Sequence, residues 1–231
     1  MFHGPLLAPT PHAFTGVADG DFRPGRPGQP DTAARLVARL GGTGALRIVN
    51  QVHGAEVVHV DAIDAAWPAV LDADAIVSTR PGVVIAVRTA DCVPILVAGP
   101  GGVAAIHAGW RGTAADVARA GVAALCAATG CRASDLRAVV GPCISGAMYE
   151  VGAEVVPACS GVAPRGGAPW FHVGPAGREH VDLARLNANI LADLGVQVDV
   201  LGLCTASDRR LWSHRRDGEP SGRQVAAIRW G

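Results

Sequence analysis

The sharpest pattern in the chain lies within residues 83–115, where short apolar runs alternate with polar residues. The runs at residues 83–87, 93–98 and 103–106 consist almost entirely of Val, Ile, Leu and Ala. Each run is too short for a stable helix and has the length of a buried strand. The pattern predicts three consecutive strands, with polar residues standing at their ends.

Helical periodicity appears elsewhere, at residues 31–40, 114–129 and 182–194. A glycine follows the end of each segment, as is common where helices terminate. Thr113 has an acidic residue three positions later, a pattern that favours the start of a helix at this point. We therefore expect three amphipathic helices.

Alternating residues indicate further strands. They lie at residues 46–54, 56–60, 136–140 and 196–204, with an edge strand near Phe14. The last segment predicts a hairpin made of residues 211–216 and 224–230, joined by a turn at residues 217–222. Residues 157–180 are rich in Gly and Pro and are expected to form a loop.

Strands interleaved with a few helices predict an α+β fold, a single domain of mixed β-sheets covered by helices. Residues 1–30 carry many prolines and glycines and are interpreted as an N-terminal segment of that same domain. The rest of the domain is expected to span residues 31–231.

Composition narrows the class of protein. The chain has 231 residues, 49% of them hydrophobic, and 20 basic against 20 acidic residues give a net charge of +0. Balanced, scattered charge argues against nucleic acid or a membrane surface as a partner. No apolar run is long enough to span a membrane and the first residues do not resemble a signal peptide, so we expect a cytoplasmic protein.

Three side chains at predicted strand ends could bind a metal: His53, Cys92 and His107. Two imidazoles and a thiolate suit a zinc ion that keeps a fourth position open, as catalytic zinc sites do. The same trio could hold copper. A metal-free cysteine hydrolase, with Cys92 as nucleophile and a histidine as base, would use the same residues.

Two charged residues near this trio are candidate catalytic residues. Asp91, next to Cys92, could orient a water or act as a base, with bonding to backbone N–H groups as the alternative. Arg111 stands in a glycine-containing turn ahead of a predicted helix and could bind phosphate or a carboxylate, with a structural ion pair as the alternative.

Successive blocks of the chain from about residue 46 to its end resemble the laccase-domain family, also called the multicopper polyphenol oxidase, purine nucleoside phosphorylase or peptidoglycan editing factor family. The blocks read QVHG from Gln51, TADCVP from Thr89, HAGWRG from His107, GPCI from Gly141, YEVG from Tyr149, CT from Cys204, WSHRRDG from Trp212 and GRQ from Gly222.

This resemblance implies an α+β zinc enzyme whose metal is held by His53, Cys92 and His107. It implies phosphorolysis of adenosine, inosine, guanosine and methylthioadenosine, together with adenosine deamination. The alternative is an editing factor that hydrolyses L-serine from a UDP-linked muramyl precursor. A copper polyphenol oxidase is a lesser alternative, since the chain has no His-x-His pair. A non-catalytic binding module is another, favoured by an arginine that is missing near the N-terminus.

The expected partners are thus a nucleoside or nucleotide-linked substrate and phosphate. Gln51, Cys143 and Arg215 stand within the blocks and are candidate substrate-binding residues, although the local pattern favours a packed thiol for Cys143 and a surface position for Arg215. The chain departs from the family near Phe14, where an arginine is missing from the block that usually reads HGFSTR. Arg23 or Arg26 are the available replacements.

Overall fold

The computed structural model describes residues 1–60 and 71–231, and its strands form three sheets. The strands are β1 (His12–Phe14), β2 (Val57–His59), β3 (Ala75–Ser78), β4 (Val84–Thr89), β5 (Val93–Gly99), β6 (Gly102–Ala108), β7 (Arg137–Val140), β8 (Phe171–Val173), β9 (Glu179–Val181), β10 (Gln197–Val200) and β11 (Gln224–Arg229). A six-stranded sheet has the order β10-β7-β5-β6-β3-β2, a three-stranded sheet the order β1-β11-β4, and β8 pairs with β9.

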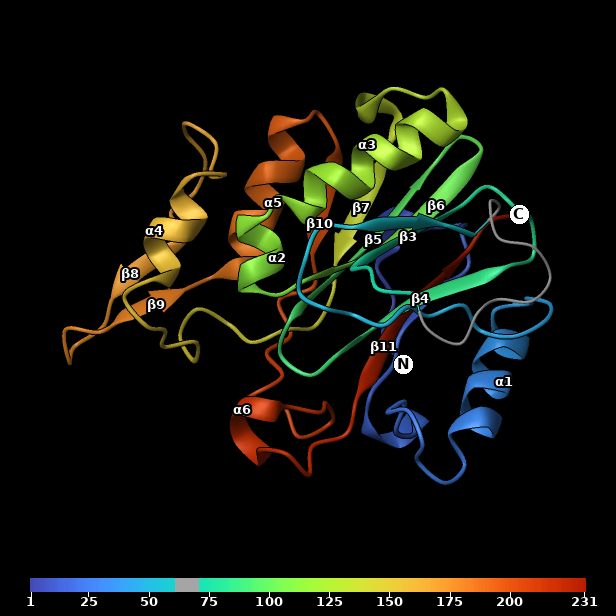
Figure 1. Ribbon diagram of the computed structural model, residues 1–231, viewed down its shortest axis with the longest axis horizontal. Helices are drawn as coiled ribbons and strands as arrows, with labels where there is room; N and C mark the ends of the chain where they lie inside the picture. Colours follow the sequence, from blue (N-terminus) through green and yellow to red (C-terminus); the bar gives the residue numbers. More distant parts are fainter. Residues whose placement is uncertain (61–70) are drawn as a thin grey trace.

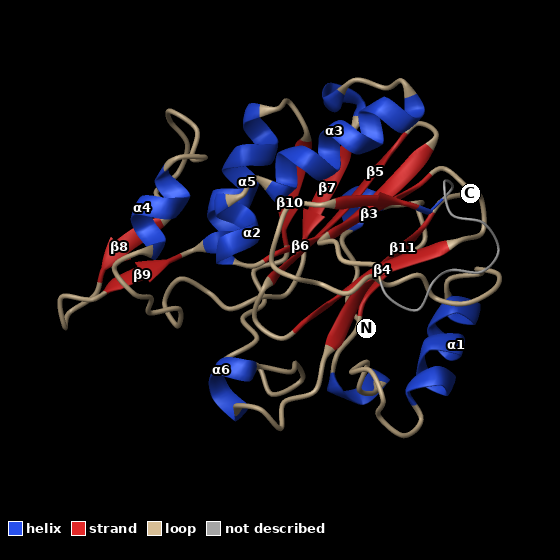
Figure 2. Ribbon diagram, viewed as in Figure 1, coloured by secondary structure: helices blue, strands red, loops and turns tan. Residues whose placement is uncertain are grey.

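Helices cover the outer sides of the two larger sheets, and two short ones lie elsewhere (Figures 1 and 2). They are α1 (Gln29–Arg39), α2 (Trp110–Ala114), α3 (Val117–Thr129), α4 (Val155–Ser160), α5 (Leu183–Asp193) and α6 (His214–Asp217), with short 3-10 turns at Pro5–Leu7, Val17–Asp19 and Ala133–Asp135. In Figure 1, α2, α3 and α5 cover the six-stranded sheet, whereas α1 lies beside the three-stranded sheet. The two short helices that lie elsewhere are α4, beside β8 and β9, and α6, in the connection that leads to β11.

The alternation of side chains along β5 shows how the layers are held together. Ile95 and Val97 enter the core beneath α3 and α5, whereas Leu96 enters a second core shared with β4 and β11. A third core lies between the other face of β4 and β11 and the helix residues Leu36 and Val37. The order is helix, sheet, sheet, helix, and both faces of the central strands are covered, which explains their continuous apolar runs.

Several predicted elements are confirmed. The three consecutive apolar runs are β4, β5 and β6, and the strand near Phe14 is β1, which pairs with β11. The sheets combine parallel and antiparallel pairs, as in β10 with β7 and β5 with β6. The fold is therefore the predicted α+β domain of mixed sheets covered by helices.

The predicted C-terminal hairpin is wrong. Residues His214–Asp217 form α6, which begins after Ser213 because its hydroxyl accepts a hydrogen bond from the Arg216 N–H. Strand β11 pairs instead with β1 on one side and β4 on the other, at the centre of the three-stranded sheet. The turn-like residues 217–222 form the connection between α6 and β11.

The helix predicted over residues 114–129 is divided. Helix α2 begins at Trp110 rather than Thr113, and α3 begins at Val117, because Asp116 between them has a left-handed backbone with φ of 66°. Such a φ is unfavourable for a residue with a side chain and breaks the run of helical hydrogen bonds. Gly130 ends α3, as the pattern predicts.

Other segments also differ from the prediction. The predicted loop at residues 157–180 contains part of α4, all of β8 and the start of β9. The predicted strand at residues 46–54 forms isolated bridges only, at Arg47 and Asn50, and the strand predicted at residues 196–204 ends at Val200. Part of the strand predicted at residues 56–60 is β2, and β3 had no sequence prediction.

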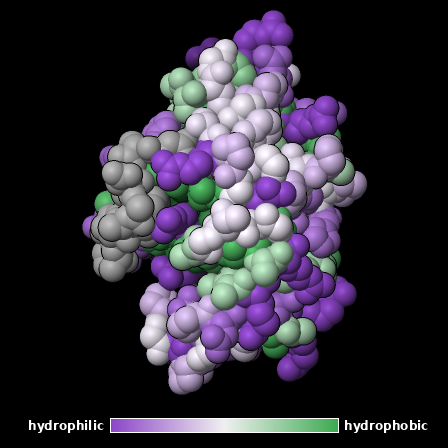
Figure 3. Space-filling model, turned by 90° about the vertical axis from the view of Figure 1, so that its right-hand side faces the viewer, coloured by the Kyte–Doolittle hydropathy of each residue, from purple (hydrophilic) through white to green (hydrophobic). Residues whose placement is uncertain are grey.

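Figure 3 shows hydrophilic and hydrophobic residues interspersed on the side of the molecule that carries α1. Among the helices of residues 1–60 and 71–231, none is long and apolar enough to cross a lipid bilayer.

Candidate metal centre

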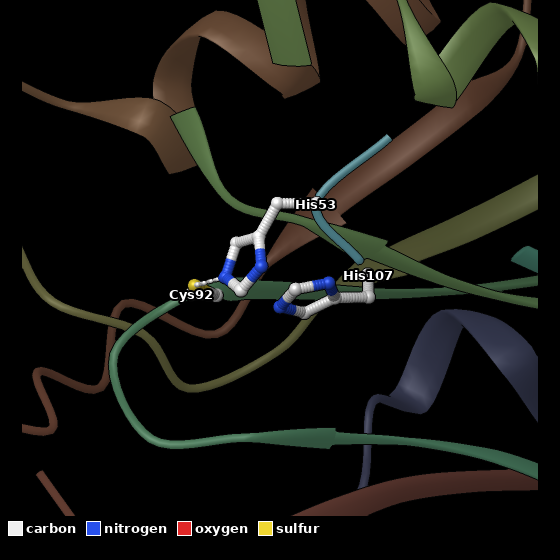
Figure 4. A group of neighbouring side chains, drawn as sticks. All are labelled: His53, Cys92 and His107. Carbon is white, nitrogen blue, oxygen red and sulfur yellow. Dashed lines mark hydrogen bonds between the residues drawn. The ribbon is translucent and has the colours of Figure 1, made fainter. Parts of the chain in front are cut away.

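The three predicted ligands meet at one end of the six-stranded sheet (Figure 4). Cys92 immediately precedes β5, and His107 lies near the end of β6, which pairs antiparallel with β5 so that Pro94 stands opposite His107. His53 comes from the loop before β2 and has a φ of 62°. The β5–β6 pairing fixes two ligands, and a strained loop residue brings the third beside them.

Asp74 is a fully buried residue just before β3, and its carboxylate is hydrogen-bonded to both His53 and His107. Its Oδ1 accepts hydrogen bonds from the His53 N–H at 3.0 Å and from His107 Nδ1 at 2.8 Å, and its Oδ2 accepts from the Gly54 N–H at 2.6 Å. Burial alone would raise the pKa of Asp74, but the bonds from His107 and Gly54 keep that pKa below its usual value. With Nδ1 engaged, the Nε2 atom of His107 is left for a metal.

The distances between the ligand atoms suit a metal ion. Sγ of Cys92 lies 3.8 Å from Nε2 of His53, and the ligand atoms of the three residues all lie within 4.8 Å of one another. A tetrahedral zinc ion with bonds of about 2.3 Å to sulfur and about 2.0 Å to nitrogen would place the sulfur roughly 3.5 Å from each nitrogen and the nitrogens roughly 3.3 Å apart. A small inward movement would complete the coordination, and three protein ligands leave a fourth position open.

The charges within the trio favour a thiolate. Burial opposes ionisation of Cys92, but the neighbouring His107 and His53 lower the pKa of its thiol to about 6. Burial also disfavours the charged form of His107, yet Cys92 and Asp74 raise its pKa to about 9. Metal ligation requires a thiolate and neutral imidazoles, so a metal would replace the proton that this pair otherwise shares.

Gly109, directly after β6, allows the three side chains to approach. A Cβ at this position would lie 2.8 Å from His53 Cδ2 and 3.1 Å from Cys92 Sγ. The glycine in the HAGWRG block therefore makes room for the side chains of two of the three candidate ligands.

The trio opens into a depression of 610 Å³ where the ends of the two larger sheets meet. Its described lining consists of Arg23, Pro24, Asn50, Gln51, His53, Arg88, Thr89, Ala90, Cys92, His107, His214, Glu219 and Arg223. Three arginines face one glutamate in this set, so the depression suits an anionic ligand. Its volume is that of a small-molecule site.

Only one of the three candidate substrate-binding residues lines this depression. Both ends of the Gln51 amide bond the backbone of Arg88, with Nε2 donating to its carbonyl and Oε1 accepting from its N–H. Cys143 is buried in the core beneath α5, where burial raises the pKa of its thiol far above the usual value. Arg215 donates two hydrogen bonds to the Glu150 carbonyl and lies over the Tyr149 ring.

Asp91 and Arg111 are also engaged away from the ligand atoms. The Asp91 carboxylate accepts hydrogen bonds from the Thr205 hydroxyl and from the Arg215 N–H, an arrangement that favours the structural alternative. Arg111 is exposed, with its guanidinium carbon 4.2 Å from the centre of the Trp110 ring. Any anion that it binds would lie outside the described lining of the depression.

Asp74, Arg88 and Arg223 emerge as site residues only from the structure. In the sequence, Asp74 is marked only as an acid directly before the short apolar run that forms β3. Arg23, a predicted replacement for the missing family arginine, does line the depression. Counting from His12, Val17 takes the place of the missing arginine, and it lines a separate hollow near the N-terminus.

Comparison with known proteins gives consistent matches. The family model described as multi-copper polyphenol oxidoreductase laccase matches residues 31–231. A purine nucleoside phosphorylase of Deinococcus radiodurans is 36% identical over 99% of this chain and 92% of its own length, and one of Xylella fastidiosa is 38% identical over 85% and 76%. The solved structure of the Bacillus licheniformis hypothetical protein YfiH has a TM-score of 0.80 at 27% identity and covers 88% of this chain and 81% of its own. The chain belongs to the multi-copper polyphenol oxidoreductase laccase family.

Proposed function

We propose that this protein is a zinc-dependent enzyme that cleaves adenosine, inosine, guanosine and methylthioadenosine with phosphate and deaminates adenosine. The observation that carries the proposal is the His53, Cys92 and His107 trio, which opens into a depression lined by arginines. Relatives named purine nucleoside phosphorylase support the substrate class.

The residues of the depression have distinct tasks in this reaction. In phosphorolysis a phosphate oxygen bonds to C1′ of the ribose, the C1′–N9 bond breaks, and the departing purine takes up a proton. The positive charge of the lining attracts the phosphate to the depression beside the trio. Asp74 keeps His107 in the tautomer that a metal needs, and a bound zinc ion would supply Lewis acidity.

The direct test is to incubate zinc-loaded protein with inosine, with and without inorganic phosphate, and to follow hypoxanthine by chromatography. We expect release that requires phosphate and yields ribose 1-phosphate in equal amount. Adenosine in parallel should give both adenine and inosine. Absence of phosphate-dependent hypoxanthine release from zinc-loaded protein would contradict the proposal.

The arginine lining favours a second candidate, the hydrolysis of L-serine from a UDP-linked muramyl precursor. A diphosphate carries the same anionic groups as inorganic phosphate and could lie against the same side chains. Serine release that needs zinc but not phosphate would support this candidate over phosphorolysis.

The metal-free alternative predicts a different response to chelators. A cysteine hydrolase would use the Cys92 thiolate and the nearby imidazoles directly, so it would keep its activity after zinc is removed. A multicopper oxidase needs several copper sites, whereas His53, Cys92 and His107 form the one metal-competent trio within the described residues. Zinc and copper reconstitution, each assayed with inosine and with a phenol, separates these alternatives. A binding module would turn over neither substrate.

A further inference from the structure

Two arginines reach the same depression from neighbouring strands. Arg88 lies near the end of β4 and Arg223 directly precedes β11, and the antiparallel pairing sets Arg88 opposite Val225. Burial lowers the pKa of Arg88, and the positive charge of Arg223 lowers it further. Both side chains therefore stand at the same end of the β4–β11 pair and line one depression, and an arginine keeps its positive charge there.

Neither cation is neutralised within the described part of the chain. The guanidinium of Arg88 donates to the Val49 carbonyl at 3.0 Å, and Nη1 of Arg223 donates to the Ser221 and Gly222 carbonyls. In residues 1–60 and 71–231 no carboxylate lies within ion-pair distance of either guanidinium. These contacts orient the two side chains but leave their charges unbalanced.

Arg23, the third arginine of the depression, differs in this respect. Its Nη2 lies 2.8 Å from the Asp21 carboxylate, and its Nε donates to the same group. Asp21 already balances Arg23, and the Glu219 carboxylate forms no ion pair with an arginine of residues 1–60 and 71–231. Within that part of the chain, the lining arginines that lack an ion-pair partner are therefore Arg88 and Arg223. Partly buried like charges that face a cavity are stabilised by an anion between them.

We propose that Arg88 and Arg223 form the phosphate-binding site of the depression, beside the metal trio. The ligand chemistry is a phosphate group, supplied either as inorganic phosphate or as the diphosphate of a nucleotide. The inference rests on the proposed function of this depression and identifies the residues that hold its anionic substrate.

Gln51 has a supporting task in this arrangement. Its amide bonds both the N–H and the carbonyl of Arg88, at 2.8 and 2.7 Å, in the way that a neighbouring strand would. Gln51 is therefore a positioning residue that fixes the backbone of Arg88. His53, two residues further along the same loop, belongs to the trio.

The test measures anion binding by isothermal titration calorimetry in zinc-loaded protein, with inorganic phosphate in one arm and UDP in the other. The variants are Arg88→Gln and Arg223→Gln, which keep much of the side-chain length and remove the charge. Arg165→Gln is the matched control, because Arg165 is exposed and lies outside the described lining of the depression. Circular dichroism and zinc content establish that each variant is folded and loaded.

We expect the dissociation constant of at least one anion to rise about tenfold or more in each of the two variants and to stay unchanged in the control. Dependence on both arginines in the phosphate arm identifies inorganic phosphate as the source, and dependence in the UDP arm identifies a nucleotide. If Arg88→Gln fails to fold, Arg223→Gln carries the test. Wild-type affinity for both anions in a folded, zinc-loaded variant overturns the proposal.

Turnover distinguishes failure of this inference from failure of the proposed function. Arginine-dependent phosphate binding without hypoxanthine release would keep the anion site and refute phosphorolysis. Phosphorolysis with an unchanged KM for phosphate in both variants would keep the proposed function and refute the anion site. A KM that rises for phosphate and stays constant for inosine is the result expected if both hold.

Discussion

Asp74 is the residue on which the geometry of the trio depends most. It has no exposed surface, and its carboxylate accepts hydrogen bonds from the Val52, His53 and Gly54 amides and from the His107 imidazole. One side chain thus sets the backbone of one ligand and the tautomer of another. A carboxylate behind a ligating histidine also makes that histidine a stronger donor.

Asp74→Asn should weaken zinc binding by about 10- to 100-fold, because an amide is a poorer acceptor for the histidine proton. Competition with a chromophoric chelator measures the affinity. Asp72→Asn is the control, since Asp72 is exposed and accepts a hydrogen bond from the Asn50 side chain instead. Equal zinc affinities in the two folded variants would show that Asp74 has no such role.

At the scale of elements, β1 is held by a histidine that must remain neutral. Nε2 of His12 accepts a hydrogen bond from the Gly4 N–H at 2.9 Å, while Nδ1 lies 2.8 Å from the Thr10 carbonyl. A second proton on the ring would point at the Gly4 N–H. Burial accordingly lowers the pKa of His12 below 6.5, although the bond to Thr10 opposes that shift.

This arrangement predicts acid destabilisation of β1. In the unfolded chain His12 takes up a proton near pH 6.5, whereas in the folded protein it does so only at a lower pH. The contribution of neutral His12 to the free energy of unfolding is therefore complete above about pH 6.5. It is lost as the pH falls from about 6.5 towards the lower pKa of the folded state. The free energy of unfolding, measured by urea titration between pH 8 and 5 at saturating zinc, should fall less in His12→Gln than in the wild type.

His172→Gln, on the exposed strand β8, is the control and should keep the slope of the wild type. Identical slopes for His12→Gln and the wild type would mean that His12 does not carry this pH dependence. The comparison between variants cancels the contributions of the carboxylates, most of which titrate at lower pH.

Elements could be predicted where their pattern was local. The apolar runs of β4, β5 and β6 are too short for helices, so their sequence alone indicates strands. Gly130 and Gly195 likewise mark the ends of α3 and α5. The pairing of β11 was not local, because its buried residues belong to the middle of a sheet rather than to a hairpin. The left-handed backbone at Asp116 likewise has no signature in the composition of the surrounding segment.

At the scale of the whole molecule, the site forms where the two larger sheets meet. The metal trio could be predicted because Cys92 and His107 flank strands that adjoin in sequence, and because its motifs resemble a family. Arg88 and Arg223 could not be paired in advance, since only the contact of β4 with β11 brings them together. The predicted hairpin does not contain that contact, so the sequence did not indicate that the site carries paired arginines suited to an anion.

The proposed phosphorolysis requires one zinc ion, held by His53, Cys92 and His107. The most direct measurement adds zinc stepwise to metal-free protein and records phosphate-dependent hypoxanthine release against bound zinc. We expect a linear rise that stops at one zinc per chain, and a Cys92→Ser variant that binds zinc weakly and stays nearly inactive at the same additions. Full activity in the metal-free protein, or in zinc-depleted Cys92→Ser, would contradict this requirement for zinc.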